Sequence, residues 1–255
     1  MFNVLLNQPL LNILIFLHNF LFNNLGLAII VLTVIIRLIL IPVTVPQMKS
    51  ARRIQEINPE LEKLKKKYKD DRQKLAQAQI ELYKKYGINP ASGCLPSILQ
   101  FILLISLFQV FNQVIRTGES LEAIKNQLYS FISPPSSLNF NFLYLDLTKP
   151  DLIKISNFVQ IPGLFVILST VFQFLSSKLM SPAVNKIEKE AKKTEEKTDD
   201  MAVAMQKQML YLFPIMTLFF GYTMPSGVIL YWFTFSLFSF LQQIILNKSQ
   251  KGKVL

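Results

Sequence analysis

Residues 26–46, GLAIIVLTVIIRLILIPVTVP, place one arginine, Arg37, inside a segment that is otherwise long and apolar enough to cross a membrane. A guanidinium keeps its proton, and an arginine at the centre of a bilayer costs about 2.5–3.5 kcal/mol even on the most lenient scale. Thr33 and Thr44 fall on the same helical face as Arg37. We therefore predict that Arg37 faces a water-accessible cavity shared with other helices. The alternative is an arginine that snorkels to a lipid headgroup beyond Pro42.

The composition is that of a membrane protein with a strongly basic surface. Of the 255 residues, 51% are hydrophobic, and the mean hydropathy of +0.36 is too high for an ordinary soluble domain. The net charge of +11 is typical of chains that contact nucleic acid, the ribosome or anionic lipid. Cys94 is the only cysteine and His18 the only histidine, which excludes cysteine- or histidine-rich metal sites and a histidine-based triad. We expect no metal, no cofactor and no enzymatic activity.

Hydropathy predicts an all-α membrane protein. Five transmembrane helices would form a core bundle, joined by a cytoplasmic antiparallel helical hairpin and an N-terminal interfacial amphipathic helix. The predicted segments are an extracytoplasmic interfacial helix at 1–24, the first span at 25–46, the hairpin at 47–90, the second span at 94–115, an extracytoplasmic loop at 116–155, the third span at 156–178, a cytoplasmic linker at 179–207, the fourth span at 208–224, the fifth span at 227–246 and a basic cytoplasmic tail at 247–255.

The first segment combines an asparagine face with an apolar remainder. Asn12, Asn19 and Asn23 share one helical face, and we interpret His18 as an interfacial polar residue rather than a ligand. Residues 1–24 contain no Lys or Arg, so they lack the basic region of a secretory signal or a transit peptide. This favours a bacterial plasma (inner) membrane over an organelle.

The hairpin is predicted from a heptad pattern of apolar residues, Ile54, Ile57, Leu61, Leu64 and Tyr68. Asn58–Pro59 predicts a kink in its first helix, and Gly87 ends the second. The hairpin carries twelve Lys or Arg against six Asp or Glu, either as an ordinary solvated surface or as a docking arm for an anionic partner. The residues proposed for such an arm are Lys63, Lys65, Lys66, Lys67 and Arg72.

The distribution of Lys and Arg predicts the orientation. A cytoplasmic hairpin makes the linker and the tail cytoplasmic too, and the hairpin, residues 178–207 and the tail hold twelve, seven and three Lys or Arg residues. The segments on the opposite side, 1–24 and 116–155, hold four. The positive-inside rule therefore predicts a multi-pass protein with its N-terminus outside and its C-terminus inside.

Polar stripes on the other spans offer neighbours for Arg37. The third span carries Ser169, Gln173 and Ser176, the fifth Trp232, Ser236, Ser239 and Gln243, and the second Gln100. A single Ser or Gln often only mediates helix packing, but stripes at matched depth favour a shared polar groove. The predicted groove residues are Arg37, Thr33, Gln100, Ser169, Gln173, Trp232 and Ser236. No predicted span contains Asp or Glu, which argues against a proton-relay pump.

A cytoplasm-open polar cavity suggests a use. It would hold a polar peptide segment partway into the bilayer and so shorten its path through hydrocarbon. The chain has no Walker A or GxSxG motif, so the energy would come from the substrate's own apolar helix entering lipid.

Four motifs resemble the YidC/Oxa/Albino family of membrane protein insertases, in its short bacterial form. They are LTVIIRLILIPVT at 32–44, YGINPASGCLP at 86–96, FLYLDLTKPD at 142–151 and FPIMTLFFGYTMPSGVILYWFTFSLFSFLQQ at 213–243. The resemblance implies a five-helix core with a hydrophilic groove in which Arg37 receives the translocating segment. It also implies that Gln173 and Trp232 line the groove, and it assigns Gln100 there through the pattern Gly-Cys-Leu-Pro-x-x-x-Gln.

The expected partners are nascent membrane proteins and the lipid bilayer, with no small-molecule substrate. The ribosome, the signal recognition particle machinery and a Sec-type translocon are further candidates. Two other functions stay open. A small transporter or channel subunit would need a path to both sides and usually shows internal repeats, which we do not find. A passive assembly scaffold is not excluded by any sequence feature.

Overall fold

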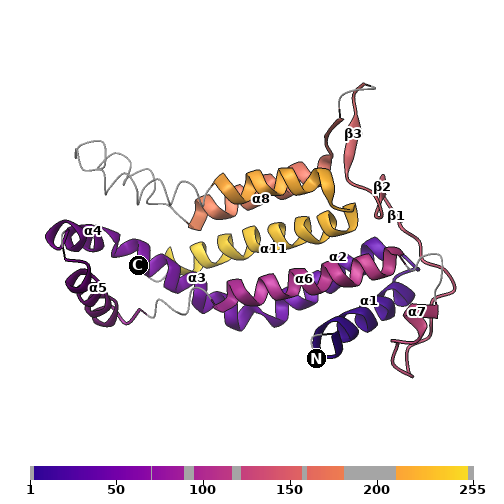
Figure 1. The fold of residues 1–255 in the computed structure, drawn as a ribbon, viewed down its shortest axis with the longest axis horizontal. Coiled ribbons are helices and arrows are strands. Elements are labelled where there is room, and N and C mark those ends of the chain that lie inside the picture. Colours follow the sequence, from indigo (N-terminus) through magenta and orange to yellow (C-terminus); the bar gives the residue numbers. More distant parts are fainter. Residues whose placement is uncertain are drawn as a thin grey trace.

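The computed structural model describes residues 3–69, 71–88, 95–116, 122–156, 160–180 and 211–251, and the chain is mostly helical (Figure 1). The elements are η1, a π-helical turn (Asn3–Asn7), α1 (Gln8–Phe20), α2 (Leu25–Ile39), α3 (Ile41–Glu56), α4 (Asn58–Lys67), α5 (Arg72–Lys85), α6 (Leu95–Arg116), α7 (Glu122–Lys125), β1 (Asn141–Phe142), β2 (Leu145–Asp146), β3 (Leu152–Lys154), β4 (Gln160–Pro162), α8 (Leu164–Met180), the unlabelled helix Tyr211–Thr223 and α11 (Ser226–Lys251). Most of the predicted linker lies outside the described residues.

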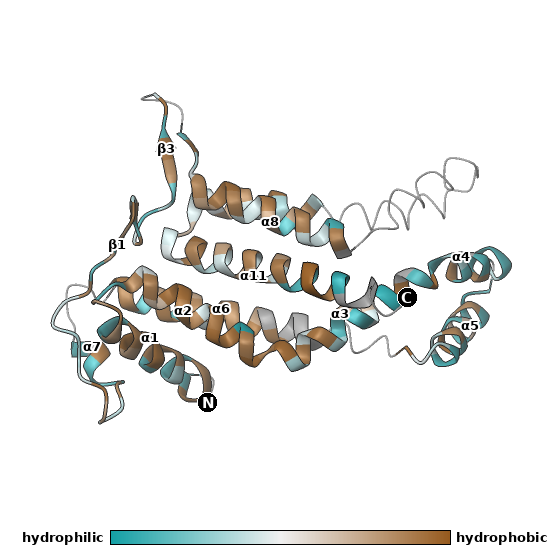
Figure 2. Ribbon diagram, turned by 180° about the vertical axis from the view of Figure 1, so that it is seen from behind, coloured by the Kyte–Doolittle hydropathy of each residue, from teal (hydrophilic) through white to brown (hydrophobic). Residues whose placement is uncertain are grey.

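Helix α11 is at the centre of the bundle. It packs most extensively against α8 and next against α2, and Figures 1 and 2 show it between them. Helix α1 packs on α2, and α6 contacts both α1 and α11. Buried apolar side chains of α1, α2, α6 and α11 share one core. The hairpin α4–α5 projects from one end, and the short strands and α7 gather at the other. Figure 2 shows the long helices as mainly hydrophobic and α4–α5 as mainly hydrophilic.

The first predicted span is broken. Helix α2 ends at Ile39, α3 begins at Ile41, and the two are bent by 65°. Pro42 lies in the first turn of α3, where its ring restricts the residue before it and it offers no N–H to the ladder of α2. The continuous helix predicted for 25–46 is therefore wrong at Leu40, and α3 runs on into the region assigned to the hairpin.

The described residues include one helix long enough to cross a membrane by itself. Among them, Ser226–Lys248 is by itself long and apolar enough to cross a membrane, and α2 with α3 qualifies as one broken span. The helices Phe101–Ile115, Leu164–Leu179 and Tyr211–Thr223 are apolar but shorter.

One predicted boundary also differs from the structure. The third span was expected from residue 156, but Gln160–Pro162 pairs with Leu152–Lys154 as an antiparallel hairpin, and α8 starts only at Leu164. The physical reason is the sequence Pro162–Gly163. Proline and glycine are the two poorest helix formers, so α8 does not extend past them toward the N-terminus. At the other end, helix α11 continues to Lys251, so residues 247–251 of the predicted basic tail are helical.

Helix α1 docks on the protein through its asparagines. Asn12 Nδ2 donates to the carbonyl of Gln127 at 2.9 Å, and Asn12 Oδ1 accepts from the N–H of Tyr129 at 2.7 Å. Asn19 Nδ2 donates to the carbonyl of Ser133 at 2.8 Å. Much of the asparagine face therefore holds the 122–156 segment, and His18, predicted as interfacial, is fully buried.

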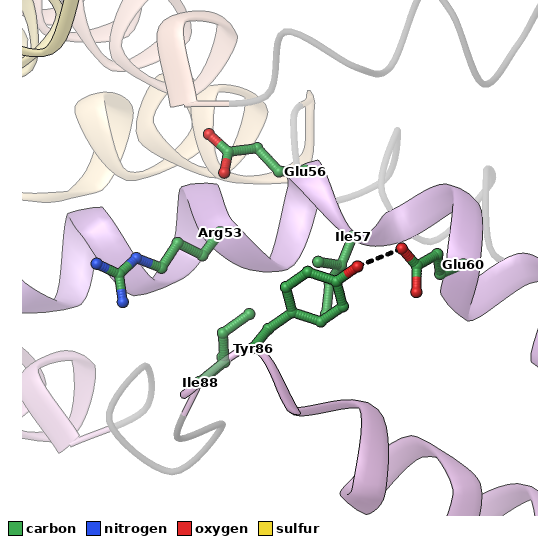
Figure 3. A pocket seen from close by; sticks show the side chains of 6 residues that line it. All are labelled: Arg53, Glu56, Ile57, Glu60, Tyr86 and Ile88. Carbon is green, nitrogen blue, oxygen red and sulfur yellow. Dashed lines mark hydrogen bonds between the residues drawn. The ribbon is translucent and has the colours of Figure 1, made fainter. Parts of the chain in front are cut away.

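Helices α4 and α5 form a hairpin with its own small core, made by Ile57, Leu61, Leu82 and Ile88. The kink is where the sequence predicts it, because α3 ends at Glu56 and Pro59 lies in the first turn of α4. The Tyr86 hydroxyl donates to Glu60 across the hairpin, and this bond raises the pKa of Tyr86. Figure 3 shows both residues beside a pocket of about 290 Å³ at the α3–α4 junction.

Gly87 ends α5 with φ of +61°, and a Cβ there would meet no atom within 4 Å. Because only the backbone conformation disfavours a side chain, Gly87→Ala should destabilise the hairpin by about 1–2 kcal/mol. Hydrogen exchange of the α5 amides measures this loss. Gly87→Asn is the matched control and should lose clearly less, since Asn tolerates the left-handed region. Equal losses for the two variants would contradict this explanation.

Candidate functional site: a buried arginine between α2 and α11

Arg37 lies near the C-terminal end of α2, and its side chain is buried, with the residue 8% exposed. The helix begins at a side-chain cap, where Asn24 Oδ1 accepts from the N–H of Leu27 at 2.9 Å. At the same end Gly26 packs against Phe142, and a Cβ would lie 2.3 Å from that ring. These contacts fix the position and the rotation of α2 at its N-terminal end. With this rotation Arg37 projects toward α11.

The guanidinium is held by one hydroxyl, one amide and two aromatic rings of α11. Its Nη2 donates to Ser239 Oγ at 2.6 Å and to Gln242 Oε1 at 3.3 Å. Its Cζ lies 4.4 Å from the ring centroid of Phe235 and 5.2 Å from that of Phe238. Cation–π contacts and neutral acceptors stabilise the charge without neutralising it.

The charge of Arg37 is only partly compensated. Among the described residues no carboxylate pairs with Arg37, and its Nε is buried with no hydrogen-bond partner. Ser236 Oγ and both amide atoms of Gln243 on α11 are also buried without partners. Such groups cost free energy while they are unsatisfied, so this region favours polar or anionic groups that could reach it.

Gln242 connects Arg37 to the helix beyond the bend. Its Oε1 accepts from Arg37, and its Nε2 donates to Thr44 Oγ1 at 3.0 Å. Thr44 lies on α3, beyond the bend at Leu40, and therefore not on one straight helix with Arg37. The shared partner Gln242 nevertheless links the two residues. The residue Gln242 therefore ties α2, α3 and α11 together at one point.

The other predicted groove residues lie as follows. Thr33 and Ser169 donate to carbonyls of their own helices, those of Ile29 and Phe165. Gln173 Oε1 accepts from the hydroxyl of Thr217 at 2.6 Å, on the α8 side of α11. The ring of Trp232 lies 6.3 Å from that of Phe220. Helix α6 carries Gln100, but the side chain of Gln100 lies outside the described residues.

The structure therefore brings Arg37 together with Ser239 and Gln242 and gives Gln173 a different partner. Sequence reasoning missed Gln242, Thr217 and the two phenylalanine rings. The adjacent amides Gln242 and Gln243 in an apolar helix were a usable signal, because paired amides at membrane depth need partners.

The predicted docking arm is largely solvent-exposed. Lys63, Lys66, Lys67 and Arg72 are exposed, and Lys65 is partly buried. The described residues contain no group of three or more His, Cys, Asp or Glu side chains arranged to hold a metal.

Comparison with known proteins places this architecture in a family. The family model described as "60Kd inner membrane protein" matches residues 16–253. The chain belongs to the YidC family of membrane protein insertases. It is 35% identical to the membrane protein insertase YidC of Fusobacterium nucleatum over 88% of this chain and 87% of that one. It is 32% identical to that of Clostridium tetani, over 96% and 95%.

A solved structure agrees with the fold. The YidC insertase crystal structure with its first transmembrane domain resolved matches with a TM-score of 0.53 and 25% identity. The match covers 91% of this chain but 44% of that one, so this chain spans less than half of that larger YidC.

For this YidC-family chain, Gln242→Leu should loosen α3 from α11, because the substitution removes both bonds of the bridge. Thr44→Val removes one of them and keeps the shape. We expect a double-mutant cycle of thermal stability in detergent to give a coupling energy of about 0.5–1.5 kcal/mol between the two positions. Thr33→Val, whose hydroxyl bonds only to its own helix, is the control and should be additive with Gln242→Leu. Additive effects at Thr44 would contradict the bridge.

Proposed function

We propose that this chain inserts membrane proteins by holding a polar segment of a nascent chain at Arg37 and releasing its hydrophobic helix laterally into lipid. The observation that carries the proposal is a buried cation with neutral partners and an unpartnered Nε. An acidic or carbonyl-rich segment would supply what the site lacks. The names of the matched relatives, membrane protein insertases, support the same activity.

The site must open before a nascent segment reaches it. Arg37 is 8% exposed and covered by α11, so a segment would replace Ser239 and Gln242 as partners of the guanidinium. Both residues keep a second bond when this happens, Ser239 to the carbonyl of Phe235 and Gln242 to Thr44. The exchange therefore leaves one acceptor on α11 without its donor, the Gln242 Oε1 that accepts from Arg37 at 3.3 Å, so the cost of opening is confined to that atom.

We further propose the topology of five spans in a bacterial plasma membrane, with the N-terminus outside and the C-terminus inside. The spans would be α2 with part of α3, α6, α8, the helix Tyr211–Thr223 and α11. The surplus of Lys and Arg in the hairpin, linker and tail supports this orientation. Cysteine accessibility at Lys65 and Lys125, on opposite sides in this topology, tests it directly.

The exposed cations of α4 and α5 would dock an anionic partner, such as ribosomal RNA. Replacing Lys63, Lys66, Lys67 and Arg72 with Glu should weaken binding to ribosome–nascent chain complexes. The negative slope of log K against log salt concentration should become shallower by about 1 for each phosphate that the variant no longer neutralises. Lys125→Glu, on α7 at the other end of the bundle, is the control. An unchanged slope in the fourfold variant would contradict the docking role.

Reconstitution tests the function itself. The purified chain in liposomes should protect the short acidic tail of a single-span substrate from added protease. Flux of small solutes without tail protection would instead indicate a channel. Neither flux nor protection, together with intact binding of substrate, would indicate a passive scaffold.

A further inference from the structure

The hairpin formed by β3 and β4 has one apolar face, whereas its other face carries Lys154 and Gln160 beside the partly buried pair Leu152 and Pro162. Its register pairs Ile153 with Ile161 and Lys154 with Gln160. Directly opposed residues share a face and neighbours along a strand alternate, so the two isoleucines lie together and Lys154 lies on the opposite side. Ile153 is 44% exposed, and Ile155, two residues further on, is 65% exposed.

The hairpin projects sideways from the bundle. Figures 1 and 2 show β3 extending across the direction of the long helices, at the end where α8 begins. The first turns of α8 continue the apolar surface, because Leu164, Ile167 and Val171 are exposed. The apolar surface therefore follows α8 and turns outward at its N-terminal end. This is the arrangement expected where a protein surface passes from the hydrocarbon core of a bilayer into the headgroup region.

The base of the hairpin is anchored to α8. The N–H of Gly163 donates to the carbonyl of Asp151 at 2.7 Å, and the buried Asp151 carboxylate accepts from the N–H of Phe165 at 3.0 Å. Beyond the base, the Tyr222 hydroxyl donates to the carbonyl of Gln160 at 3.3 Å. These bonds fix the direction of the hairpin, so its exposed isoleucines are held away from the core.

We propose that the apolar face of this hairpin, Ile153 and Ile161, together with the exposed Ile155 just after β3, lies in the headgroup region of the outer lipid leaflet and anchors the extracytoplasmic end of α8. This anchor rests on the proposed topology, in which α8 crosses the membrane. Lipid fits better than protein because two short strands offer far less than the ~800 Å² per partner of a stable interface. A lone two-stranded hairpin is also marginal in water, and an interface that takes up its apolar face would stabilise it. Lys154, on the other face, stays in water.

Depth-dependent fluorescence tests this in the full chain. In a Cys94→Ser background, the substitutions Ile155→Cys, Lys154→Cys and Val171→Cys are made singly and labelled with an environment-sensitive dye. The proteins are then reconstituted in phosphatidylethanolamine–phosphatidylglycerol vesicles. We expect blue-shifted emission at position 155, quenched more by nitroxides near the headgroup than by deep ones. Position 154 should be quenched several-fold less, and position 171 mainly by deep nitroxides.

The three labelled positions distinguish a failure of the lipid anchor from a failure of the proposed topology. Water-like, unquenched emission at 155 with normal quenching at 171 overturns the lipid anchor and leaves the bundle in the membrane. Blue-shifted emission at 155 without nitroxide quenching also overturns it, and a dependence on the protein-to-lipid ratio would identify a second copy as the occupant. Absent quenching at 171 would overturn the membrane crossing itself and the anchor with it.

Discussion

Replacing Arg37 with methionine should reduce insertion of a single-span substrate with an acidic tail by about tenfold to a hundredfold. A hydrogen bond to a charged group contributes about 1.5–3 kcal/mol, and about 1.4 kcal/mol corresponds to a factor of ten. The measurement is the rate at which the substrate tail becomes protected in vesicles. The loss of insertion should be smaller for a matched substrate whose tail has no acidic residue, because only an anionic tail forms an ion pair with Arg37.

The same substitution should leave the bundle folded and at least as stable. Ser239 Oγ and Gln242 Nε2 keep other partners when the guanidinium is removed, and the loss of a buried cation with an unpartnered Nε outweighs the one donor that Gln242 Oε1 loses. Thermal unfolding in detergent should therefore show an equal or higher midpoint, the combination typical of a functional residue that costs stability. Arg37→Lys keeps the charge and should lose less insertion activity. Full activity of Arg37→Met, or a collapse of its folding, would contradict this role.

Replacing Asp151 with alanine should destabilise the protein by about 2–4 kcal/mol, since it leaves buried donors at the start of α8 without an acceptor. Gly163, just before α8, has no side chain to cap the helix. Asp151 caps it from a distance, accepting from Phe165 at 3.0 Å and from Val166 at 3.3 Å. A Cβ on Gly163 would lie 1.7 Å from the carboxylate, which explains the glycine. We expect the unfolding midpoint to fall by roughly 5–15 °C.

Two variants separate capping from the other contact of Asp151. Its Oδ1 accepts from the Tyr144 hydroxyl at 3.0 Å, and burial together with the charge of Asp151 raises the pKa of Tyr144 to about 12. A raised pKa favours folding while the hydroxyl is protonated, so this contribution is present at neutral pH and is lost as the pH rises through about 12. Tyr144→Phe should thus cost less than Asp151→Ala. Asp151→Asn keeps an acceptor oxygen and should also cost less; a full loss in Asp151→Asn would show that the charge dominates.

The sequence was sufficient for features governed by local chemistry. The apolar run around Arg37, the kink at Pro59 and the helix stop at Gly87 follow from side-chain polarity and backbone geometry, and the structure has the kink and the stop where they were predicted. The break at Leu40 was missed even though Pro42 was visible, because a proline close to a helix end can start a new helix as readily as it ends one. The β3–β4 hairpin was missed because each of its strands is only three residues long, too short to show an alternating pattern.

The family of this chain and the presence of one arginine within a long apolar run were determined by the sequence alone, because motif order and hydropathy are properties of the chain before it folds. Only the tertiary structure decided which groups meet that arginine. Because α11 packs between α2 and α8, Arg37 donates hydrogen bonds to Ser239 and Gln242, whereas Gln173 accepts one from Thr217. Helical periodicity predicts which residues share a face, but the rotation of one helix against another depends on contacts made far away along the chain.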